Sequence, residues 1–305
     1  MLSPPDTVRP APSFRDHLAR SARAVEAELS RVLPAPSGHQ SVIMEAVRYA
    51  ALGGGKRLRP FLVIETARLL GGDAHNALTV GCALECLHVY SLVHDDLPCM
   101  DDDDLRRGKP TVHRAFDEAT AVLAGDALLT FAFERLAHED AHPDPAVRAR
   151  LVLELARASG THGMIGGQVV DINVADGERD LALITQLQAM KTGALIRFAC
   201  KAGALVSGAE AHDLAALDRY STALGLAFQI QDDVLDVEGT EAALGKAVGK
   251  DANLGKATFV STLGLAGAKH KARELGDTAR AALAPYGDCA NTLLGAVDFV
   301  LERTH

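Results

Sequence analysis

An acidic cluster follows directly on a long apolar run, and this junction limits how the chain can fold. Between His94 and His113 the chain carries six aspartates within ten positions, after an apolar run from Val80 to Val93. Two carboxylates about 4 Å apart repel each other by roughly 4 kcal/mol at an effective dielectric near 20. Either water solvates the cluster as an acidic loop, or cations occupy it. All-oxygen ligands select a hard cation, usually Mg²⁺ where phosphates complete its coordination shell.

A second acidic segment favours the cation-binding alternative. The sequence from Gln229 to Asp236 is QIQDDVLD, and its neighbours are mostly apolar. Asp232 and Asp236 are four residues apart, so they share one face of a helix, and Gln229 lies on the same side. Carboxylates on an otherwise buried helix are costly unless they are paired or bound to metal. We therefore expect the two acidic segments to face each other across a cavity that binds a polyanion with several Mg²⁺ ions.

The spacing of apolar residues predicts an all-α, single-domain helical bundle around this central cavity. Of the 305 residues, 48% are hydrophobic and only 4% are aromatic, which favours helices packed through small residues. No series of strands with a period of two appears. Residues 1–38 form a proline-containing lead-in and the first helix, and residues 39–305 form the rest of the domain. Helices are expected at 18–32, 39–52, 60–70, 76–95, 118–139, 145–159, 181–206, 210–235, 259–283 and 289–301.

Charge and cysteine usage limit the class of partner and the compartment. A net charge of −9 argues against nucleic acid as the main partner. The five cysteines include no CxxC pair, which indicates reduced thiols inside the cell. The first residues lack the apolar core of a signal peptide, and no run of about 18 apolar residues occurs. We therefore expect no stable membrane insertion and a cytoplasmic location.

Several separated motifs, in the same order, resemble those of the trans-polyprenyl diphosphate synthases. DDLPCMD at Asp95 to Asp101 resembles the family's first aspartate-rich motif, in the form with two extra residues between the aspartates. DDVLD at Asp232 to Asp236 resembles the second. The resemblance extends from about Val42 to the C-terminus and is strongest to the bacterial farnesyl diphosphate synthases. The other matching segments are GGGKRLRP at 53–60, LAGD at 123–126, GGQVVD at 166–171, KTGALI at 191–196 and GKAVGKD at 245–251.

The resemblance implies a Mg²⁺-dependent prenyltransferase. In this family an allylic diphosphate ionises to a carbocation, the double bond of isopentenyl diphosphate attacks it, and loss of a proton leaves a longer allylic diphosphate. Asp95, Asp101 and Asp232 are the expected metal ligands. Asp96 and Asp236 are further candidates, either directly or through water. The family also implies three Mg²⁺ ions once substrate is bound, Mn²⁺ as a substitute, and a homodimer.

The same resemblance assigns basic and polar residues to two diphosphate sites. Isopentenyl diphosphate is expected to bind Lys56, Arg59 and Arg107, with His88 as their partner. Lysine can hold phosphate oxygens as a point charge, whereas Thr and Gln side chains stabilise nearby positive charge through their dipoles. The residues expected at the allylic diphosphate are Arg106, Lys191, Thr192, Gln229 and Lys246, and all of these except the last are expected to be catalytic.

Two residues of the apolar run are candidates for setting product length. Tyr90 lies five residues before Asp95, about 7.5 Å along a helix from the metal-binding end, and Ser91 lies four before it. Tyr90 is large enough to form a floor under the growing tail, although simple core packing also explains it, while Ser91 blocks little. We expect (2E,6E)-farnesyl diphosphate from dimethylallyl or geranyl diphosphate. The first alternative is synthesis of geranylgeranyl or geranyl diphosphate. A class I terpene cyclase is the second alternative.

Other classes of protein fit parts of the pattern. Glu85 and His88 form an ExxH like those of di-iron bundles, which need two such motifs and two further glutamates. The pair His94 and Asp95 resembles the HD pair of metal phosphohydrolases. A terpene cyclase would not need the basic set around His88, and a non-catalytic helical protein would need neither acidic motif. None of these alternatives accounts for the two acidic motifs and the lysines together.

Overall fold

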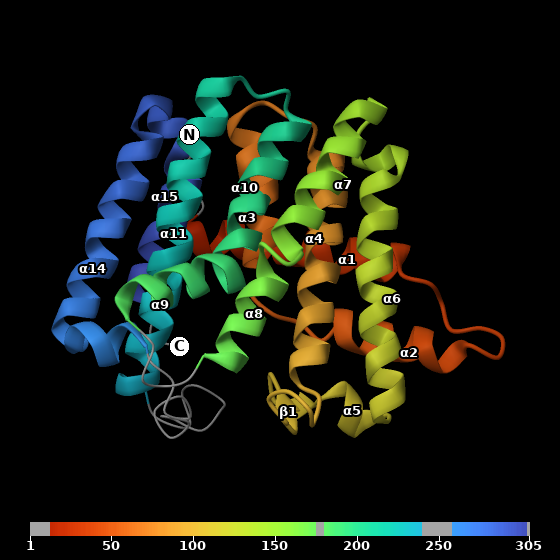
Figure 1. The fold of residues 1–305 in the computed structure, drawn as a ribbon. Coiled ribbons are helices and arrows are strands. Elements are labelled where there is room, and N and C mark those ends of the chain that lie inside the picture. The colour runs from red at the N-terminus through yellow and green to blue at the C-terminus, as the bar shows by residue number, and fades with distance from the viewer. Residues whose placement is uncertain (1–12, 175–179, 240–257, 304–305) are drawn as a thin grey trace, which may run out of the picture.

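The computed structural model describes residues 13–174, 180–239 and 258–303, and this part of the chain is almost entirely helical (Figure 1), which confirms the all-α prediction. Within these residues the only sheet is a hairpin of two antiparallel strands, β1 (Leu105–Arg106) and β2 (Lys109–Pro110). The helices are α1 (Phe14–Val32), α2 (Ser41–Ala51), α3 (Leu58–Leu69), α4 (Ala74–Asp95), α5 (Val112–Ala115), α6 (Glu118–Ala137), α7 (Pro145–Ser159), α8 (Met164–Asn173), α9 (Leu181–Gln188), α10 (Ala194–Val206), α11 (Ala211–Glu238), α14 (Phe259–Leu283) and α15 (Asn291–Glu302), with the short turns η1 (Glu139–Ala141), η3 (Ala189–Gly193) and η4 (Ala284–Ala290).

Helix α4 carries the apolar run and is buried against α3 and α6. Asp73 caps its N-terminus by accepting hydrogen bonds of 2.9 Å from the backbone N–H groups of His75 and Asn76. By length and composition α4 could span a membrane, but 72% of its most apolar window is buried inside the bundle. The apolar run is therefore the central helix of the core, and its end carries the acidic cluster.

The first helix shares this core. Val25 and Leu29 of α1 are fully buried in the same hydrophobic cluster as α3 and α4. Phe14, at the start of α1, packs edge-on against Phe61 of α3 with 5.3 Å between the ring centroids. The helix predicted before residue 38 thus packs against the body of the bundle and is not a separate arm.

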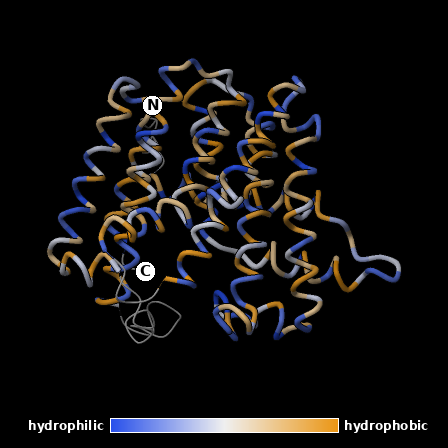
Figure 2. The backbone as a smooth tube through the Cα atoms, in the orientation of Figure 1, coloured by the Kyte–Doolittle hydropathy of each residue, from blue (hydrophilic) through white to orange (hydrophobic). Residues whose placement is uncertain are grey.

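Helices α4 and α11 both end on the lower side of the molecule in Figure 1, with α8 and α9 between them in this view. The hairpin of β1 and β2 lies just below the end of α4. Figure 2 shows a hydrophilic segment at this hairpin, and other hydrophilic segments along the outer helices, while hydrophobic stretches follow the helices through the bundle. The fold therefore brings both acidic segments, distant in sequence, to one side of the molecule.

The chain between residues 160 and 206 differs from the expected helices. The sequence pattern predicts one helix over 181–206, whereas the structure has α9, the π-helical turn η3 and then α10. The pattern does not predict α8, because two adjacent glycines lower its helix propensity. A Cβ atom on Gly167 would lie 2.4 Å from the backbone nitrogen of Lys191, so only glycine lets α8 approach η3 this closely. Such π-turns occur frequently at functional sites.

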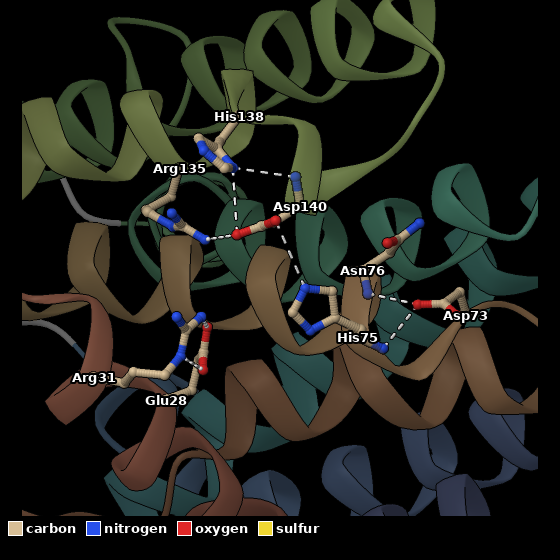
Figure 3. Close-up of polar contacts among 8 residues, drawn as sticks. All are labelled: Glu28, Arg31, Asp73, His75, Asn76, Arg135, His138 and Asp140. Atoms are coloured by element: carbon tan, nitrogen blue, oxygen red, sulfur yellow. Dashed lines mark hydrogen bonds and ion pairs between the residues drawn. The ribbon is translucent and has the colours of Figure 1, made fainter.

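A polar cluster at the other end of α4 ties down the connection after α6 (Figure 3). Asp140, in η1, accepts a hydrogen bond of 3.0 Å from Arg135 on α6. His138 lies 3.3 Å from the same carboxylate, and His75 of α4 lies 3.9 Å from it. This cluster therefore fixes the connection between α6 and α7 against the start of α4.

Candidate active site

A cavity of about 1490 Å³ opens at the ends of the two acidic helices. Its wall also includes residues of the hairpin, of α8 and of η3. Lys56, Asp96, Asp101 and Asp236 do not line it, and Lys246 lies outside the described residues. The other predicted site residues all lie in its wall: Arg59, His88, Tyr90, Ser91, Asp95, Arg106, Arg107, Lys191, Thr192, Gln229 and Asp232.

Asp95 lies at the end of α4, and a tight turn brings Asp101 beside it. The backbone N–H of Asp101 donates a hydrogen bond of 2.8 Å to the backbone carbonyl of Asp95. Burial raises the pKa of Asp95 from 3.8 to about 6, and the charge of Asp101 adds to this shift. Lys191 opposes the shift. A carboxylate destabilised by burial and by a second carboxylate is stabilised by a hard cation, so this pair suits Mg²⁺.

The second acidic segment contributes Asp232 and Asp236. Asp232 lies in the cavity wall and forms an ion pair of 2.8 Å with Arg303, which also covers the ring of Phe228. One turn further along α11, Asp236 has a buried carboxylate oxygen that no hydrogen bond among the described residues satisfies. A buried carboxylate oxygen without a hydrogen bond is a fitting ligand for a divalent cation. The residues present therefore fit the metal ions that the two motifs predict.

Asp96 faces away from the cavity and holds Arg106. Its carboxylate is buried and accepts a hydrogen bond of 2.7 Å from Nε of Arg106. Burial raises the pKa of Asp96, while the hydrogen bond from Arg106 opposes that rise. Asp103 lies 3.5 Å from the same guanidinium, and Asp104 forms an ion pair with Arg114. Arg106 lines the cavity, whereas Asp96 does not. Asp96 therefore contributes to the site by holding Arg106 in the wall.

Arg59, His88 and Arg107 form a basic wall on one side of the cavity. Nη1 of Arg59 lies 3.2 Å from Nε2 of His88. Burial lowers the pKa of His88 well below 6.5, and the charge of Arg59 lowers it further, so His88 is neutral at pH 7 and can accept this hydrogen bond. Arg107 donates to the backbone carbonyl of Gly54 and so joins the hairpin to the loop between α2 and α3. Converging guanidinium groups of this kind suit a phosphate or diphosphate.

Helix α8 contributes two polar residues that the sequence interpretation does not assign. Nε2 of Gln168 donates a hydrogen bond of 2.9 Å to Asp95. Nζ of Lys191 donates to Asp171 at 2.7 Å. Burial lowers the pKa of Lys191, but Asp171, Asp95 and Asp101 together outweigh this and the net shift is upward, so Lys191 is charged at pH 7. Gln168 and Asp171 are three residues apart in the GGQVVD motif and share a helix face, which is the signal that could have identified them.

Thr192 and Gln229 complete the wall between η3 and α11. The side-chain amide of Gln229 donates a hydrogen bond of 2.6 Å to the side chain of Gln188. A Cβ atom on Gly225 would lie 3.3 Å from Cα of Gly193, which shows how closely α11 approaches η3. This contact places Thr192 and Gln229 in one wall.

Tyr90 and Ser91 lie in the part of the wall that α4 forms before Asp95. Tyr90 is 7% exposed and packs edge-on against His94 with 5.3 Å between ring centroids. His94 donates a hydrogen bond of 3.0 Å to the carbonyl of Val122 on α6. A Cβ atom on Gly125 would lie 2.0 Å from Nε2 of His94, so the imidazole reaches α6 because residue 125 is glycine. Contacts with α6 thus brace the aromatic side of the wall, where Tyr90 lies.

Known proteins resemble this chain in sequence and fold over nearly its whole length. The polyprenyl synthetase family model matches residues 40–284. The farnesyl diphosphate synthase of Escherichia coli (strain K12) is 44% identical over 296 residues, which cover 95% of this chain and 99% of that protein. The chloroplastic geranylgeranyl pyrophosphate synthase of Capsicum annuum is 40% identical over 293 residues, covering 95% of this chain and 79% of that protein. The apo crystal structure of a FPP/GFPP synthase from Zymomonas mobilis matches with a TM-score of 0.86 at 46% identity, covering 94% of this chain and 98% of the other. The chain described here belongs to the polyprenyl synthetase family.

Proposed function

We propose that the protein is a Mg²⁺-dependent prenyltransferase that condenses isopentenyl diphosphate with dimethylallyl or geranyl diphosphate to give (2E,6E)-farnesyl diphosphate. The observation that carries this proposal is one cavity holding Asp95, Asp232, Arg106, Lys191 and the apolar wall around Tyr90. Acidic groups for metal, cations for a diphosphate and an apolar surface for its tail are what an allylic diphosphate requires. The relatives named farnesyl diphosphate synthase support the fifteen-carbon product.

The acidic residues would hold the metal. Asp95, Asp101 and Asp232 are the proposed ligands of three Mg²⁺ ions in the substrate complex, and the unsatisfied oxygen of Asp236 supports a further contact. Mn²⁺ is expected to substitute. Once bound, these ions stabilise the negative charge of the departing diphosphate. Asp96 serves the same diphosphate through Arg106, which it holds in the wall.

The allylic diphosphate binds Arg106 and Lys191, whose positive charges offset the charge that develops on it as the carbon–oxygen bond breaks. Lys246 belongs to the same set by resemblance. Thr192 and Gln229 present their side-chain oxygens to the carbocation that remains. Because these groups are placed before the bond breaks, they favour ionisation more than they favour binding of the intact substrate.

Isopentenyl diphosphate binds the basic wall. Arg59 and Arg107 contact its diphosphate, and neutral His88 orients Arg59. Lys56 adds positive charge from the loop between α2 and α3. This places the double bond of isopentenyl diphosphate next to the allylic carbocation, so the new carbon–carbon bond forms between held partners. A proton is then lost, which leaves an allylic diphosphate with five more carbons.

Geranylgeranyl diphosphate is the second candidate product. The observation that favours it is the similarity to synthases named for that twenty-carbon product, such as the one from Capsicum annuum. Tyr90 favours the shorter product, because an aromatic ring in the wall shortens the space for the tail.

The setting of the enzyme is part of the proposal. We propose a cytoplasmic homodimer in which residues 39–305 form the polyprenyl synthase domain and residues 1–38 supply a lead-in and the first helix. Exposed apolar side chains on two neighbouring helices support a protein partner: Leu123 on α6 is 56% exposed and Leu153 on α7 is 43% exposed, and neither lines the cavity. The net charge of −9 supports the absence of a nucleic-acid partner.

Condensation in the presence and absence of metal tests the proposal. Incorporation of labelled isopentenyl diphosphate should require Mg²⁺ or Mn²⁺ and stop in EDTA. Asp95→Ala and Asp232→Ala should each lower turnover by about 100-fold or more, with a helical circular dichroism spectrum close to wild type. Asp288→Ala, in the exposed turn η4, is the matched control and should retain activity. Full activity in EDTA would contradict the proposal.

A further inference from the structure

A buried ion pair lies next to the basic wall but outside the cavity. Glu85 on α4 is 1% exposed, and Arg57 in the loop between α2 and α3 is 3% exposed. Nη1 of Arg57 donates a hydrogen bond of 2.6 Å to Glu85. Nη2 donates to Glu26 on α1 at 2.8 Å and to the carbonyl of Ala51 at 2.6 Å. Neither Glu85 nor Arg57 lines the cavity, and the proposed mechanism uses neither.

Arg57 is the residue at which this loop turns into α3. Its backbone is left-handed, with φ of 50°, at the N-cap of the helix. Residues other than glycine adopt this conformation only where surrounding contacts hold it. The hydrogen bonds from its guanidinium to α1, α2 and α4 supply that hold. Arg59 lies two residues after Arg57, in the first turn of α3, so this anchor fixes the start of the helix that carries Arg59.

Glu85 also balances the charge of the wall. Burial lowers the pKa values of Arg59 and Arg107, and the negative charge of Glu85 opposes both shifts. For Arg57, burial is outweighed by Glu85 and Glu26, and the net effect raises its pKa. Without this acid, the guanidinium groups would repel one another whenever no diphosphate lies between them.

We propose that Glu85 is a positioning residue for isopentenyl diphosphate: by anchoring Arg57 it fixes the loop that leads into α3, and with it Arg59 in the first turn of that helix, before the substrate binds. This inference rests on the proposed function, which assigns the basic wall to that substrate. A loop that is already ordered loses less conformational entropy on binding, so affinity is the property that depends on the anchor. Glu85 does not contact the substrate and is therefore not a catalytic residue.

Steady-state kinetics of Glu85→Gln tests the inference. The neutral amide keeps the shape but removes the charge that anchors Arg57. We expect the KM for isopentenyl diphosphate to rise by about tenfold or more, as for the loss of a charge-assisted hydrogen bond. The KM for geranyl diphosphate should stay within about twofold of wild type, since Asp171 holds Lys191 and Asp96 holds Arg106. A KM for isopentenyl diphosphate equal to wild type, or equal increases for both substrates, would overturn the inference.

A second variant separates positioning from stability, because removing one member of a buried ion pair also destabilises the fold. The double substitution Arg57→Met and Glu85→Met replaces the pair with apolar side chains and should restore much of the thermal stability. It leaves the loop without its anchor, so the KM for isopentenyl diphosphate should remain about tenfold raised. Recovery of both stability and KM in the double variant would show that Glu85 matters only for folding and would contradict the proposal.

A double-mutant cycle identifies the route of action. If Glu85 acts through Arg59, combining Glu85→Gln with Arg59→Ala should raise the KM for isopentenyl diphosphate little further than Arg59→Ala alone. If the two substitutions raised this KM by the product of their separate fold-changes, Glu85 would not act through Arg59. The matched control is Glu154→Gln, which removes a buried acid that pairs with Lys201 away from the cavity. This variant should lose stability with an unchanged KM.

The same experiments distinguish failure of this inference from failure of the proposed function. Wild-type protein that does not condense the two diphosphates contradicts the proposed function itself. Wild-type protein that condenses them, beside a Glu85→Gln variant with normal KM values, contradicts only the positioning role. Equilibrium binding of labelled isopentenyl diphosphate to both proteins gives the affinity independently of turnover, and a loss of about tenfold is expected there too.

Discussion

The ammonium group of Lys191 lies 2.7 Å from the carboxylate of Asp171, across the contact between the π-turn η3 and helix α8. This ion pair fixes a flexible side chain in the cavity wall, where Lys191 is proposed to bind the allylic diphosphate. We expect Asp171→Asn to raise the KM for geranyl diphosphate by about tenfold, because a charge-assisted hydrogen bond that orients the lysine is lost. Steady-state kinetics with varied geranyl diphosphate measures this effect.

The control for that variant is Asp218→Asn. Asp218 forms an ion pair of 2.6 Å with Arg197, in which both side chains are about half exposed. Exposed pairs of this kind contribute roughly 0 to 1 kcal/mol to stability, and this pair does not line the cavity. Its removal should leave both KM values unchanged. An Asp171→Asn variant that behaves like this control would remove Asp171 from the site.

Separate substitutions should distinguish the two diphosphate sites. Arg59→Ala removes a guanidinium from the basic wall and should mainly raise the KM for isopentenyl diphosphate, by roughly 10- to 100-fold. Lys191→Ala should act on the allylic substrate and on turnover. Kinetics with each substrate varied in turn decides the matter. Equal effects of each substitution on both substrates would show that the assignment of the two sites is wrong.

Product length tests the role of Tyr90. Tyr90→Ala opens the wall that His94 braces, so products of twenty carbons or more should increase. Ser91→Phe fills the same wall and should shift products towards ten carbons. Tyr49→Ala removes an aromatic ring that packs on Phe116 outside this cavity, and it should leave the product length unchanged. Chromatography of the dephosphorylated products measures the distribution, and an unchanged product from a folded Tyr90→Ala variant would remove Tyr90 as the floor.

Stability at acid pH should depend on Asp140. The hydrogen bond from Arg135 holds the pKa of Asp140 below its usual 3.8, so the ionised form stabilises the fold. This contribution is present above the unfolded pKa and is lost as pH falls through the folded pKa. Asp140→Asn should therefore lower the free energy of unfolding by about 1 kcal/mol at pH 7, since the acid is partly exposed. Urea unfolding should show that the difference in free energy of unfolding between wild type and Asp140→Asn becomes smaller below pH 4. A difference that does not change with pH would contradict this prediction.

Several features of the site follow from local spacing and were therefore predictable from sequence. The apolar run before Asp95 predicted a buried helix, and the second acidic segment favoured a cavity at its acidic end over a solvated loop. Asp232 was predictable in the same way, because it is a polar residue on an apolar helix. The helical period and the cost of burying charge are enough to predict both features.

Other features depend on packing between segments that are distant in sequence. Spacing alone could not show that Asp96, beside Asp95, faces the other way and holds Arg106. Nor could it show that α8 packs on the π-turn so closely that Gln168 reaches Asp95. The adjacent glycines of α8 permit this close approach, but they also lower its helix propensity. For this reason the sequence pattern did not predict α8.

The central claim is tested most directly by the chain length of the wild-type product. Purified protein is incubated with labelled isopentenyl diphosphate, geranyl diphosphate and Mg²⁺, and the dephosphorylated products are separated by chromatography beside farnesol and geranylgeraniol. The account predicts that farnesol carries most of the label and that EDTA abolishes it. A mainly twenty-carbon product would contradict the farnesyl assignment, and no Mg²⁺-dependent condensation at all would contradict the prenyltransferase itself.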